Sequence, residues 1–489
     1  MTINQIVNKV KENNPNADIE LLELAYEFAK KAHEGQKRKS GEPYIQHSLH
    51  TAFTLATIKA DLNTVIAGLL HDVPEDTEYT LSDVKKNFGQ EVSTLVEGIT
   101  KLSKIKYRGI ERYRESLRKM FLSMARDLRV ILIKFADRLH NLRTLDALPK
   151  EKQNRIAKET LEIYAPIAGL LGIWRLKWQM EDMCFKFLYP EEYKKLEYKY
   201  EVEKKVERNQ YIQKIKNTLK NKFNEADINS YKILGRFKHL YSIHQKMQVK
   251  DRKFDEIHDV FALRIVLPTI SECYKVLGII HSLWKPNAKR FKDYIAVPKP
   301  NGYRSLHTTI FGPEGKLTEF QIRTNEMDDE AQYGIAAHWH YKEKGGSHED
   351  KSGQPRWVKE ILKIQHDTKD TDDFIKQVKF DVFHDRIFVF TPKGDVFDLP
   401  RGATPIDLAY AVHTDVGNKA MNALVNDKIT TLDHQLKNGD LVEIIIDKKR
   451  KGPGRDWLKF VKTNKARSKI KQFSKESRLE GIKRFIPRI

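Results

Sequence analysis

The segments RFKDYIAVPKPNGYRSLHTT (290–309) and TEFQIRT (318–324) carry most of the information about the centre of this chain. In the second segment polar and apolar residues alternate, so a strand would place Glu319, Gln321 and Arg323 on one face and the apolar side chains on the other. This pattern is typical of a strand that lines a polar pocket. An ordinary solvated sheet face would give the same alternation.

Strand-like and helical patterns alternate around these segments. Strand-like runs occur at 260–267, 294–297, 305–311 and 317–322, and a helical pattern occurs at 271–284. The highly charged stretch 191–222 has few apolar positions and looks like an exposed connecting helix. Residues 191–345, including this leading helix, are therefore predicted to form a mixed α/β domain.

Several groups suited to nucleotide phosphates lie in the same region. The segment GRFKHLYSIHQK (235–246) places Arg236 and Lys238 near one another, and Asp259 precedes the predicted strand that carries Arg264. Clustered cations neutralise phosphate oxyanions, and phosphoryl-type transfer needs Mg²⁺ that carboxylates usually hold. Because no Walker A or Rossmann fingerprint is present, this pocket would not be a P-loop.

Residues 1–190 have apolar residues at helical spacing and are predicted to be all-α, although 129–135 is compatible with either a strand or a buried helix. This region contains four residues that could bind one divalent transition metal with open positions for water, namely His47, His71, Asp72 and Asp137. The alternative is that they are helix caps or surface groups, because a lone His–Asp dipeptide is a weak signal.

Two carboxylates and several cations accompany these four residues. Glu75 and Asp76 could position or deprotonate a water, and a metal-bound hydroxide beside a carboxylate is a phosphohydrolase arrangement. Arg38, Lys39 and Arg143 could neutralise substrate phosphates.

The C-terminal part predicts a small domain at 383–447, joined by a polar linker at 346–382. RIFVFT, the turn PKGD and VFDLP (386–400) predict a β-hairpin, followed by a helix near 404–413 and a strand at 441–446.

Composition limits the functional classes. The 489 residues include 88 Lys plus Arg and 67 Asp plus Glu, a net charge of +21 that favours polyanionic partners. The tail 448–489 holds 16 Lys plus Arg and three acids, so it carries +13 and leaves +8 for the rest. In this tail, cations interleave with Trp457, Phe460 and Phe473, which fits RNA contact through phosphates and through stacking of the aromatic rings on bases; a solvated basic helix is the alternative.

No run approaches the roughly 20 apolar residues of a membrane helix, and the N-terminal segment lacks the apolar region of a secretory signal. Two cysteines, Cys184 and Cys273, cannot build a disulfide scaffold. We expect a cytoplasmic protein that does not engage a membrane.

The segments RKSGEPYIQH (38–47), LLHDVPEDT (69–77) and ILIKFADRLHNLRTL (131–145) resemble the hydrolase domain of the bacterial Rel/SpoT homologue family, a branch of the HD phosphohydrolases. The resemblance implies removal of pyrophosphate from the 3′ position of guanosine tetra- or pentaphosphate. It implies that His47, His71, Asp72 and Asp137 bind Mn²⁺, that Glu75 and Asp76 serve the attacking water, and that Arg38 and Asn141 contact the nucleotide. Pro74 stands where the family commonly has an apolar β-branched residue.

Segments 290–309 and 318–324, with GIAAHWHYK (334–342), resemble the nucleotidyltransferase-like synthetase domain of the same family. This implies transfer of the β,γ-pyrophosphate of ATP to the 3′-hydroxyl of GDP or GTP. Asp259 and Glu319 would hold Mg²⁺, and Glu319 would also activate the hydroxyl. The implied nucleotide-binding residues are Arg236, Lys238, Arg264, Lys292 and Lys299 for ATP, Tyr303 for stacking on guanine, and Asn301, His307, Gln321 and Arg323 nearby.

Two features bear on this resemblance. Arg290–Asp293 has the Arg-x-Lys-Asp form that accompanies bifunctional members rather than synthetase-only members. Asp328 and Gln332 stand where the family usually has His and Glu.

Residues 383–447 resemble a TGS domain, a β-grasp module that contacts deacylated tRNA in ribosome-associated members, so His413 is a candidate RNA contact. A structural or regulatory module is the alternative, and Gly417–Lys419 reads GNK instead of the more usual GHR. The tail 448–489 resembles the start of the helical domain that follows TGS.

The sequence therefore predicts a multidomain protein. Its parts are an HD hydrolase domain (1–190), a synthetase domain (191–345), a linker (346–382), a TGS domain (383–447) and a basic helical tail. The leading hypothesis is a bifunctional synthetase and hydrolase whose two sites regulate each other reciprocally, because both running together would be a futile cycle. The alternatives are a hydrolase-dominant enzyme and a ribosome- or tRNA-binding regulator with weak synthesis.

Overall fold

The structure, a computed structural model, describes residues 1–103, 127–203, 205–236, 239–250, 261–298, 302–334, 386–437, 439–450 and 452–485. The chain splits into two compact units. The described part of the first unit lies within residues 1–334, and that of the second lies within 386–485.

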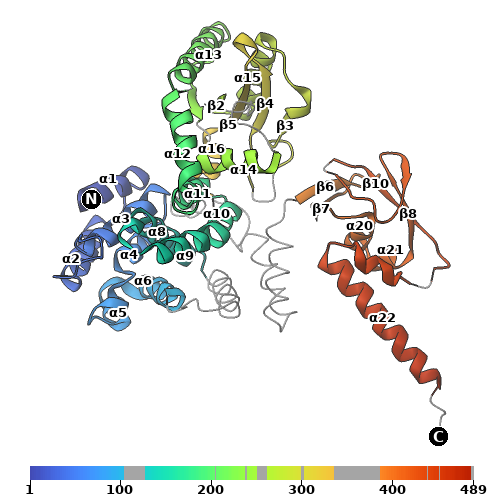
Figure 1. The fold of residues 1–489 in the computed structure, drawn as a ribbon, viewed down its shortest axis with the longest axis horizontal. Helices are drawn as coiled ribbons and strands as arrows, with labels where there is room; N and C mark the ends of the chain where they lie inside the picture. Colours follow the sequence, from blue (N-terminus) through green and yellow to red (C-terminus); the bar gives the residue numbers. More distant parts are fainter. Residues whose placement is uncertain are drawn as a thin grey trace. The chain divides into compact units, whose positions relative to one another are not determined.

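The described N-terminal part of the first unit is built from helices (Figure 1). These helices are α1 (Ile3–Asn13), α2 (Ile19–Ala32), α3 (Ile45–Thr57), α4 (Leu62–Leu70), α5 (Val73–Asp76), α6 (Leu81–Ser103), α8 (Arg129–Arg143), α9 (Lys150–Glu159), α10 (Ala165–Leu170) and α11 (Trp174–Leu188). The prediction of an all-α region is confirmed for these residues.

Local sequence explains where two of these helices begin. Asp18 accepts a hydrogen bond from the Leu21 amide at the start of α2, and Asp61 does the same for Thr64 at the start of α4. The ambiguous run 129–135 is a helix, and α8 is buried on several sides because it packs against α3, α4, α6 and α11.

The stretch predicted to be an exposed connecting helix forms α12 (Pro190–Glu197) and α13 (Lys205–Glu225). The prediction that it is exposed is correct for one face of α13 and wrong for the other. Its sparse apolar residues, Tyr211, Ile215 and Phe223 among them, fall on one face and are buried in the core of the domain that follows. A few apolar residues at helical spacing were enough to anchor a helix whose remaining positions are charged.

A five-stranded sheet forms the centre of that domain, with strand order β1-β2-β5-β4-β3. The strands are β1 (Lys232–Arg236), β2 (Phe261–Leu267), β3 (Lys292–Asp293), β4 (Leu306–Phe311) and β5 (Leu317–Thr324). Strands β2 and β5 pair in parallel, and the other neighbours pair antiparallel. The mixed α/β prediction is confirmed.

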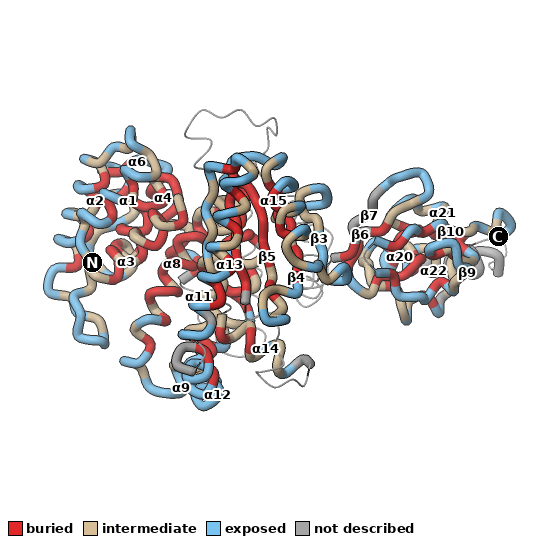
Figure 2. Tube along the Cα trace, turned by 90° about the horizontal axis from the view of Figure 1, so that it is seen from above, coloured by how far each residue is buried: buried red, intermediate tan, exposed pale blue. Residues whose placement is uncertain are grey.

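One face of this sheet packs on α13 and α15 (Ile270–Leu283), and the trace of β5 is red in Figure 2. Leu263, Ile265, Phe320 and Ile322 point into this core. The opposite face carries the polar residues described below.

One predicted strand is wrong. Residues 294–297 form a turn, because the Asp293 carboxylate accepts hydrogen bonds from the amides of Ile295 and Ala296, each at 2.9 Å. These bonds bend the chain directly after the short strand β3.

The helical and sheet regions meet through α14 (Leu240–Lys250) and α16 (Asn325–Tyr333). Asp182 on α11 accepts a hydrogen bond of 2.9 Å from the Tyr241 amide, so a carboxylate from the helical region caps the N-terminus of α14. Lys59, just after α3, forms an ion pair of 2.8 Å with Asp329 on α16. At Gly334, with φ of +54°, a Cβ would collide with the backbone of Leu171 and Gly172.

The second unit contains the predicted hairpin and helix. Its described elements are β6 (Arg386–Phe390), β7 (Val396–Pro400), α20 (Pro405–Val412), α21 (Thr414–Lys419), β8 (Ala420–Val425), β9 (Lys428–Thr430), β10 (Val442–Ile446) and α22 (Asn464–Phe485). Strands β6 and β7 pair antiparallel, and β8 lies between β10 and β9.

The start of the basic tail packs onto this small domain. Trp457, Val461 and Ile470 share a core with Tyr410 of α20. Trp457 is 4% exposed, so the expected stacking of this residue on RNA bases is wrong. The buried Asp407 carboxylate also accepts hydrogen bonds from the Lys462 and Thr463 amides.

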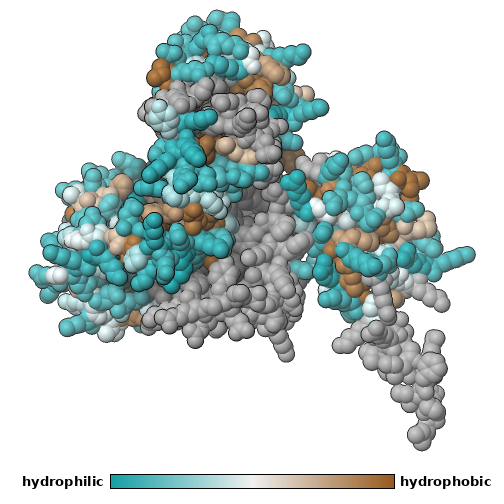
Figure 3. Space-filling view, viewed as in Figure 1, coloured by the Kyte–Doolittle hydropathy of each residue, from teal (hydrophilic) through white to brown (hydrophobic). Residues whose placement is uncertain are grey.

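Most of the visible described surface in Figure 3 is hydrophilic, with apolar residues in small groups. Among the described residues, no helix combines the length and the apolar character that a membrane crossing requires. The predicted linker at 346–382 lies outside the described residues.

Candidate active sites

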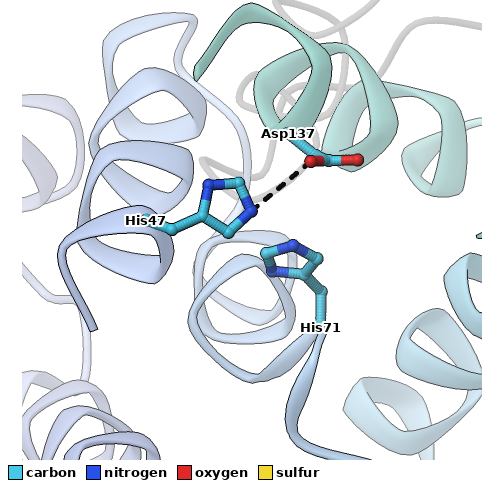
Figure 4. Close-up of side chains that lie close together, drawn as sticks. All are labelled: His47, His71 and Asp137. Carbon is cyan, nitrogen blue, oxygen red and sulfur yellow. Dashed lines mark ion pairs between the residues drawn. The ribbon is translucent and has the colours of Figure 1, made fainter. Parts of the chain in front are cut away.

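His47, His71 and Asp137 come together at the centre of the helical region, from α3, the end of α4 and α8 (Figure 4). One ligand atom from each lies within 4.8 Å of the others, and all three residues are buried. His47 Nε2 is 3.4 Å from Asp137 Oδ1.

Asp72, the fourth predicted ligand, completes the group from the turn between α4 and α5. Its Oδ2 lies 3.1 Å from His71 Nε2 and 3.4 Å from His47 Nε2. Neither imidazole Nε2 has a hydrogen-bond partner, although both are buried. Two imidazole nitrogens facing two carboxylates fit one divalent transition-metal ion.

Hydrogen bonds fix which nitrogen of each histidine faces the centre. His71 Nδ1 lies 2.9 Å from the Gly68 carbonyl, which accepts only, so Nδ1 carries a proton and Nε2 is the nitrogen that faces the carboxylates. His47 Nδ1 lies 2.9 Å from His140 Nδ1, and Arg38 Nη1 lies 3.4 Å from that same His140 nitrogen. Because arginine only donates, His140 Nδ1 is an acceptor, and His47 Nδ1 is the donor.

The carboxylates of Asp72 and Asp137, the two acidic members of the candidate metal site, are also held in place. Lys134 Nζ lies 2.7 Å from Asp137 Oδ2, and Asn141 Nδ2 donates to Asp137 Oδ1 at 2.5 Å. The Tyr44 hydroxyl lies 2.8 Å from Asp72 Oδ2 and 2.6 Å from Asp76 Oδ2. Partners of this kind orient ligands and tune their basicity.

Electrostatics concentrate negative charge at this point. Although burial favours the neutral carboxyl, the His71 imidazole holds the pKa of Asp72 well below its usual range. Burial opposes the charged imidazole of His71, but the carboxylates of Asp72 and Asp137 outweigh it and raise the pKa of His71 to about 9. Burial and the neighbouring Asp72 raise the pKa of Glu75.

The other predicted hydrolase residues lie around this group. Glu75 and Asp76 are on α5, directly after Asp72. Arg38 Nη2 donates to Asn141 Oδ1 at 2.8 Å, so the two residues predicted to contact the nucleotide are bonded to each other.

In the sheet domain, strand register aligns four of the predicted nucleotide-binding residues. Lys292 is paired with His307, His307 with Gln321, and Gln321 with Arg264. Paired residues on neighbouring strands share a face, so these four form one row across β3, β4, β5 and β2. The predicted alternation in TEFQIRT is confirmed, because Phe320 lies in the core behind this row.

Glu319 lies next to this row on the same face. Gln321 Nε2 donates to Glu319 Oε1 at 3.0 Å, and His307 Nδ1 lies 3.7 Å from the same oxygen. Tyr303 Oη lies 2.8 Å from His307 Nε2. The predicted base, the guanine-stacking residue and their neighbours are thus brought together.

Some predicted residues cannot be placed. Lys238, Asp259, Lys299 and Asn301 lie outside the described residues, and for Arg236 only its backbone position on β1 is described.

Arg323 is on the polar face but is 2% exposed and forms an ion pair with Asp328. In the second unit, exposed His413 caps α21 and lies 3.5 Å from Asp415.

Sequence reasoning missed Tyr44, Lys134 and His140. All three lie in segments already quoted for the hydrolase resemblance, 38–47 and 131–145. The partners of Tyr44 and His140 are distant in sequence, and Lys134 stands three residues before Asp137, a spacing that is common for ion pairs on any helix.

Three parts of the chain match known domain families. These are an HD domain over residues 25–174, the region found in RelA/SpoT proteins over 235–346, and a TGS domain over 387–446.

Relatives align with nearly the whole chain. This chain is 47% identical to a GTP pyrophosphokinase of Myxococcus xanthus, over 96% of its own length and 62% of that protein. Identity is also 47% to a guanosine-3′,5′-bis(diphosphate) 3′-pyrophosphohydrolase of Aquifex aeolicus, over 96% of this chain and 67% of the relative. The bifunctional (p)ppGpp synthase/hydrolase SpoT of Escherichia coli is 47% identical over 94% of this chain and 66% of its own length. The chain therefore spans about three-fifths to two-thirds of these relatives.

Proposed function

The chain belongs to the RelA/SpoT family, and we propose that it both makes and degrades (p)ppGpp. Synthesis would transfer pyrophosphate from ATP to the 3′-hydroxyl of GDP or GTP, and degradation would release that pyrophosphate by hydrolysis. The observation that carries this proposal is the presence of two chemically different sites in one compact unit. One is a buried His/Asp cluster that could hold a metal ion, and the other is a polar sheet face with a carboxylate, cations and an aromatic ring.

For hydrolysis, we assign His47, His71, Asp72 and Asp137 as ligands of Mn²⁺. The bound ion would supply an acidified water and neutralise phosphate charge. Glu75 and Asp76 would orient the water and take its proton, a role supported by the raised pKa of Glu75. Arg38 and Asn141 would hold the nucleotide, since their mutual hydrogen bond lies next to Asp137.

For synthesis, Glu319 would accept the proton of the 3′-hydroxyl as its oxygen attacks the β-phosphorus of ATP and AMP leaves. Asp259 and Glu319 would hold Mg²⁺, which neutralises charge on the transferred group. Arg236, Lys238, Arg264, Lys292 and Lys299 would bind ATP. Tyr303 would stack on guanine, with Asn301, His307, Gln321 and Arg323 nearby.

The second unit supports a proposal about partners. Its TGS domain and basic tail are proposed to contact ribosomal RNA or deacylated tRNA, with His413 as a contact because it is exposed. We also propose a cytoplasmic location, where ATP and GTP would be available as substrates.

A two-step assay tests the enzyme proposal. The protein is incubated with ATP, GDP and Mg²⁺, and a 3′-pyrophosphorylated product is sought; that product is then supplied with Mn²⁺, and its loss is followed. Glu319→Gln is expected to abolish only synthesis, and Asp72→Ala only hydrolysis. Each variant serves as the control for the other, because the substituted residues lie in different domains.

The outcomes separate the alternatives. Loss of product without its formation would indicate a hydrolase-dominant enzyme. Neither activity, together with binding to ribosomes or deacylated tRNA, would indicate a regulator and contradict the enzyme proposal.

A further inference from the structure

Asp328 on α16 forms ion pairs with two of the arginines on the polar sheet face. Its Oδ1 lies 2.5 Å from Arg323 Nη2 and 3.3 Å from Arg264 Nη1. Arg323 is on β5 and Arg264 is on β2, so one carboxylate joins the two parallel strands at the centre of the sheet.

The two arginines differ in their access to a ligand. The Arg323 side chain is 2% exposed, whereas that of Arg264 is 20% exposed. A buried guanidinium is costly unless a carboxylate pairs with it, so Asp328 is the counter-ion that allows Arg323 to be buried. Two cations on one anion leave a net positive charge, and Arg264 is the member that solvent or a nucleotide can reach.

The Asp328 carboxylate is itself fixed from two sides. Gln332 Nε2, one turn later on α16, donates to Asp328 Oδ2 at 2.6 Å, which leaves Oδ1 directed at the arginines. Thr324, the last residue of β5, caps α16 by accepting a hydrogen bond from the Met327 amide at 3.2 Å. Helix α16, which carries Asp328, therefore begins directly after strand β5, which carries Glu319.

Arg264 stands in the row with Gln321, His307 and Lys292. A guanidinium can bind a phosphate through its planar fork of donors or stack on a purine through its flat face. Holding it in advance lowers the entropy lost when a nucleotide binds.

We propose that Asp328 is a positioning residue for ATP binding, because it holds the Arg264 guanidinium on the nucleotide face. Arg323 is the buried partner that holds the Asp328 carboxylate, and it does not touch the nucleotide. This inference rests on the proposed synthetase function.

The test compares Asp328→Asn with Asp329→Asn, the same change at the next residue of α16. Asp329 pairs with Lys59 and not with the arginines. The readouts are the KM for ATP, kcat, and the dissociation constant of α,β-methylene-ATP, whose replaced bridge is the bond that synthesis breaks. Asp328→Asn is expected to raise KM and the dissociation constant roughly tenfold or more while kcat changes much less, as for the loss of one charge from a partly buried ion pair. Asp329→Asn is expected to stay within about twofold.

Two further variants separate positioning from folding. Asp328→Glu keeps the charge and is expected to recover part of the affinity. Arg323→Met/Asp328→Asn removes the buried pair together, so no unpaired charge is left inside, and it is expected to bind the analogue about as weakly as Asp328→Asn. Hydrolysis by each variant, which uses other residues, reports whether the unit is folded.

An unchanged or lowered dissociation constant in folded Asp328→Asn would overturn the proposal. A double variant much weaker than Asp328→Asn would show that Arg323 contacts the nucleotide itself. If the wild-type protein forms no product, the synthetase proposal fails, whereas the analogue-binding comparison still decides the role of Asp328.

Discussion

Asp328 and Asp329 are adjacent on α16 but form ion pairs in different domains: Asp328 with Arg323 of the sheet, and Asp329 with Lys59 of the helical region. Lys59 follows α3, the helix that carries His47. A single helix turn therefore connects the proposed synthetase face to the helix of a proposed metal ligand.

This connection predicts how the two activities influence each other. Saturating the synthetase with a non-reactive ATP analogue and a guanosine nucleotide is expected to slow hydrolysis. Lys59→Met is expected to weaken that inhibition by a factor of about two to five, the range for a partly exposed ion pair. Hydrolysis rates with and without the nucleotides measure the effect.

Lys214→Met is the matched control, since Lys214 pairs with Glu314 within the sheet domain. An equal loss of inhibition in both variants, or a hydrolysis rate that nucleotides never change, would contradict this route of coupling.

Tyr44→Phe is expected to lower the kcat of hydrolysis roughly tenfold. The substitution removes the hydroxyl that lies within hydrogen-bonding distance of both Asp72 and Asp76. It keeps the ring, which stacks on His33 with centroids 4.5 Å apart, so the fold should be retained. Steady-state hydrolysis checks the effect, Tyr26→Phe on α2 is the control, and full activity of Tyr44→Phe would show that Asp72 and Asp76 do not need the hydroxyl.

The contact between His140 and His47 predicts that replacing His140 lowers the affinity for Mn²⁺. Asn can place an acceptor near the position of His140 Nδ1, whereas Leu cannot, so only His140→Leu should leave His47 Nδ1 without its partner. We expect His140→Leu to weaken Mn²⁺ binding by about 10- to 100-fold and His140→Asn to do so much less. Calorimetric titration with Mn²⁺ measures this, and equal affinities for the two variants would refute it.

The burial of Asp182 predicts that the stability of the protein depends on pH. Burial raises the pKa of Asp182 to about 6 in the folded protein, above its usual 3.8. The folded state therefore favours the protonated form, and the resulting stabilisation, at most about 3 kcal/mol, is present below pH 4 and is lost as the pH rises through 6.

Asp182→Asn should remove this dependence and be at least as stable as wild type at pH 7, because the amide oxygen can still accept the Tyr241 hydrogen bond. Urea unfolding between pH 4 and 8 gives the difference between the two proteins. A difference that does not change with pH would show that Asp182 ionises in the folded state as freely as in the unfolded chain.

Much of the fold could be predicted from local patterns. The alternation in TEFQIRT places Phe320 and Ile322 in the core as expected, and the helical spacing of the N-terminal region is confirmed. Two predictions failed because of contacts that the pattern of apolar residues does not show. Residues 294–297 are apolar enough for a strand, but the Asp293 side chain turns the backbone there. Trp457 looked like a base-stacking residue because sequence composition does not show the small core that buries it.

The candidate sites could also be predicted only in part. The proposed metal ligands stand in recognisable segments, and the structure brings three of them within 4.8 Å of one another. Tyr44 and His140, which contact two of these ligands, could not be predicted because their contacts span long separations: His140 is 93 residues from His47, and Tyr44 is 28 residues from Asp72. The pairing of Asp328 with Arg264 depends on strand register, which the sequence does not specify until the sheet is formed.

The cap that Asp182 gives to α14 has a consequence for the order in which the chain folds. Starting a helix is its least favourable step, and a carboxylate at its first turn offsets part of that cost. Asp182 leaves the ribosome before Tyr241, and domains generally fold from the N-terminus during synthesis. The helical region can thus be in place as a template on which α14 begins, so translation itself would favour assembly of the helical region before α14 and the strands that follow it.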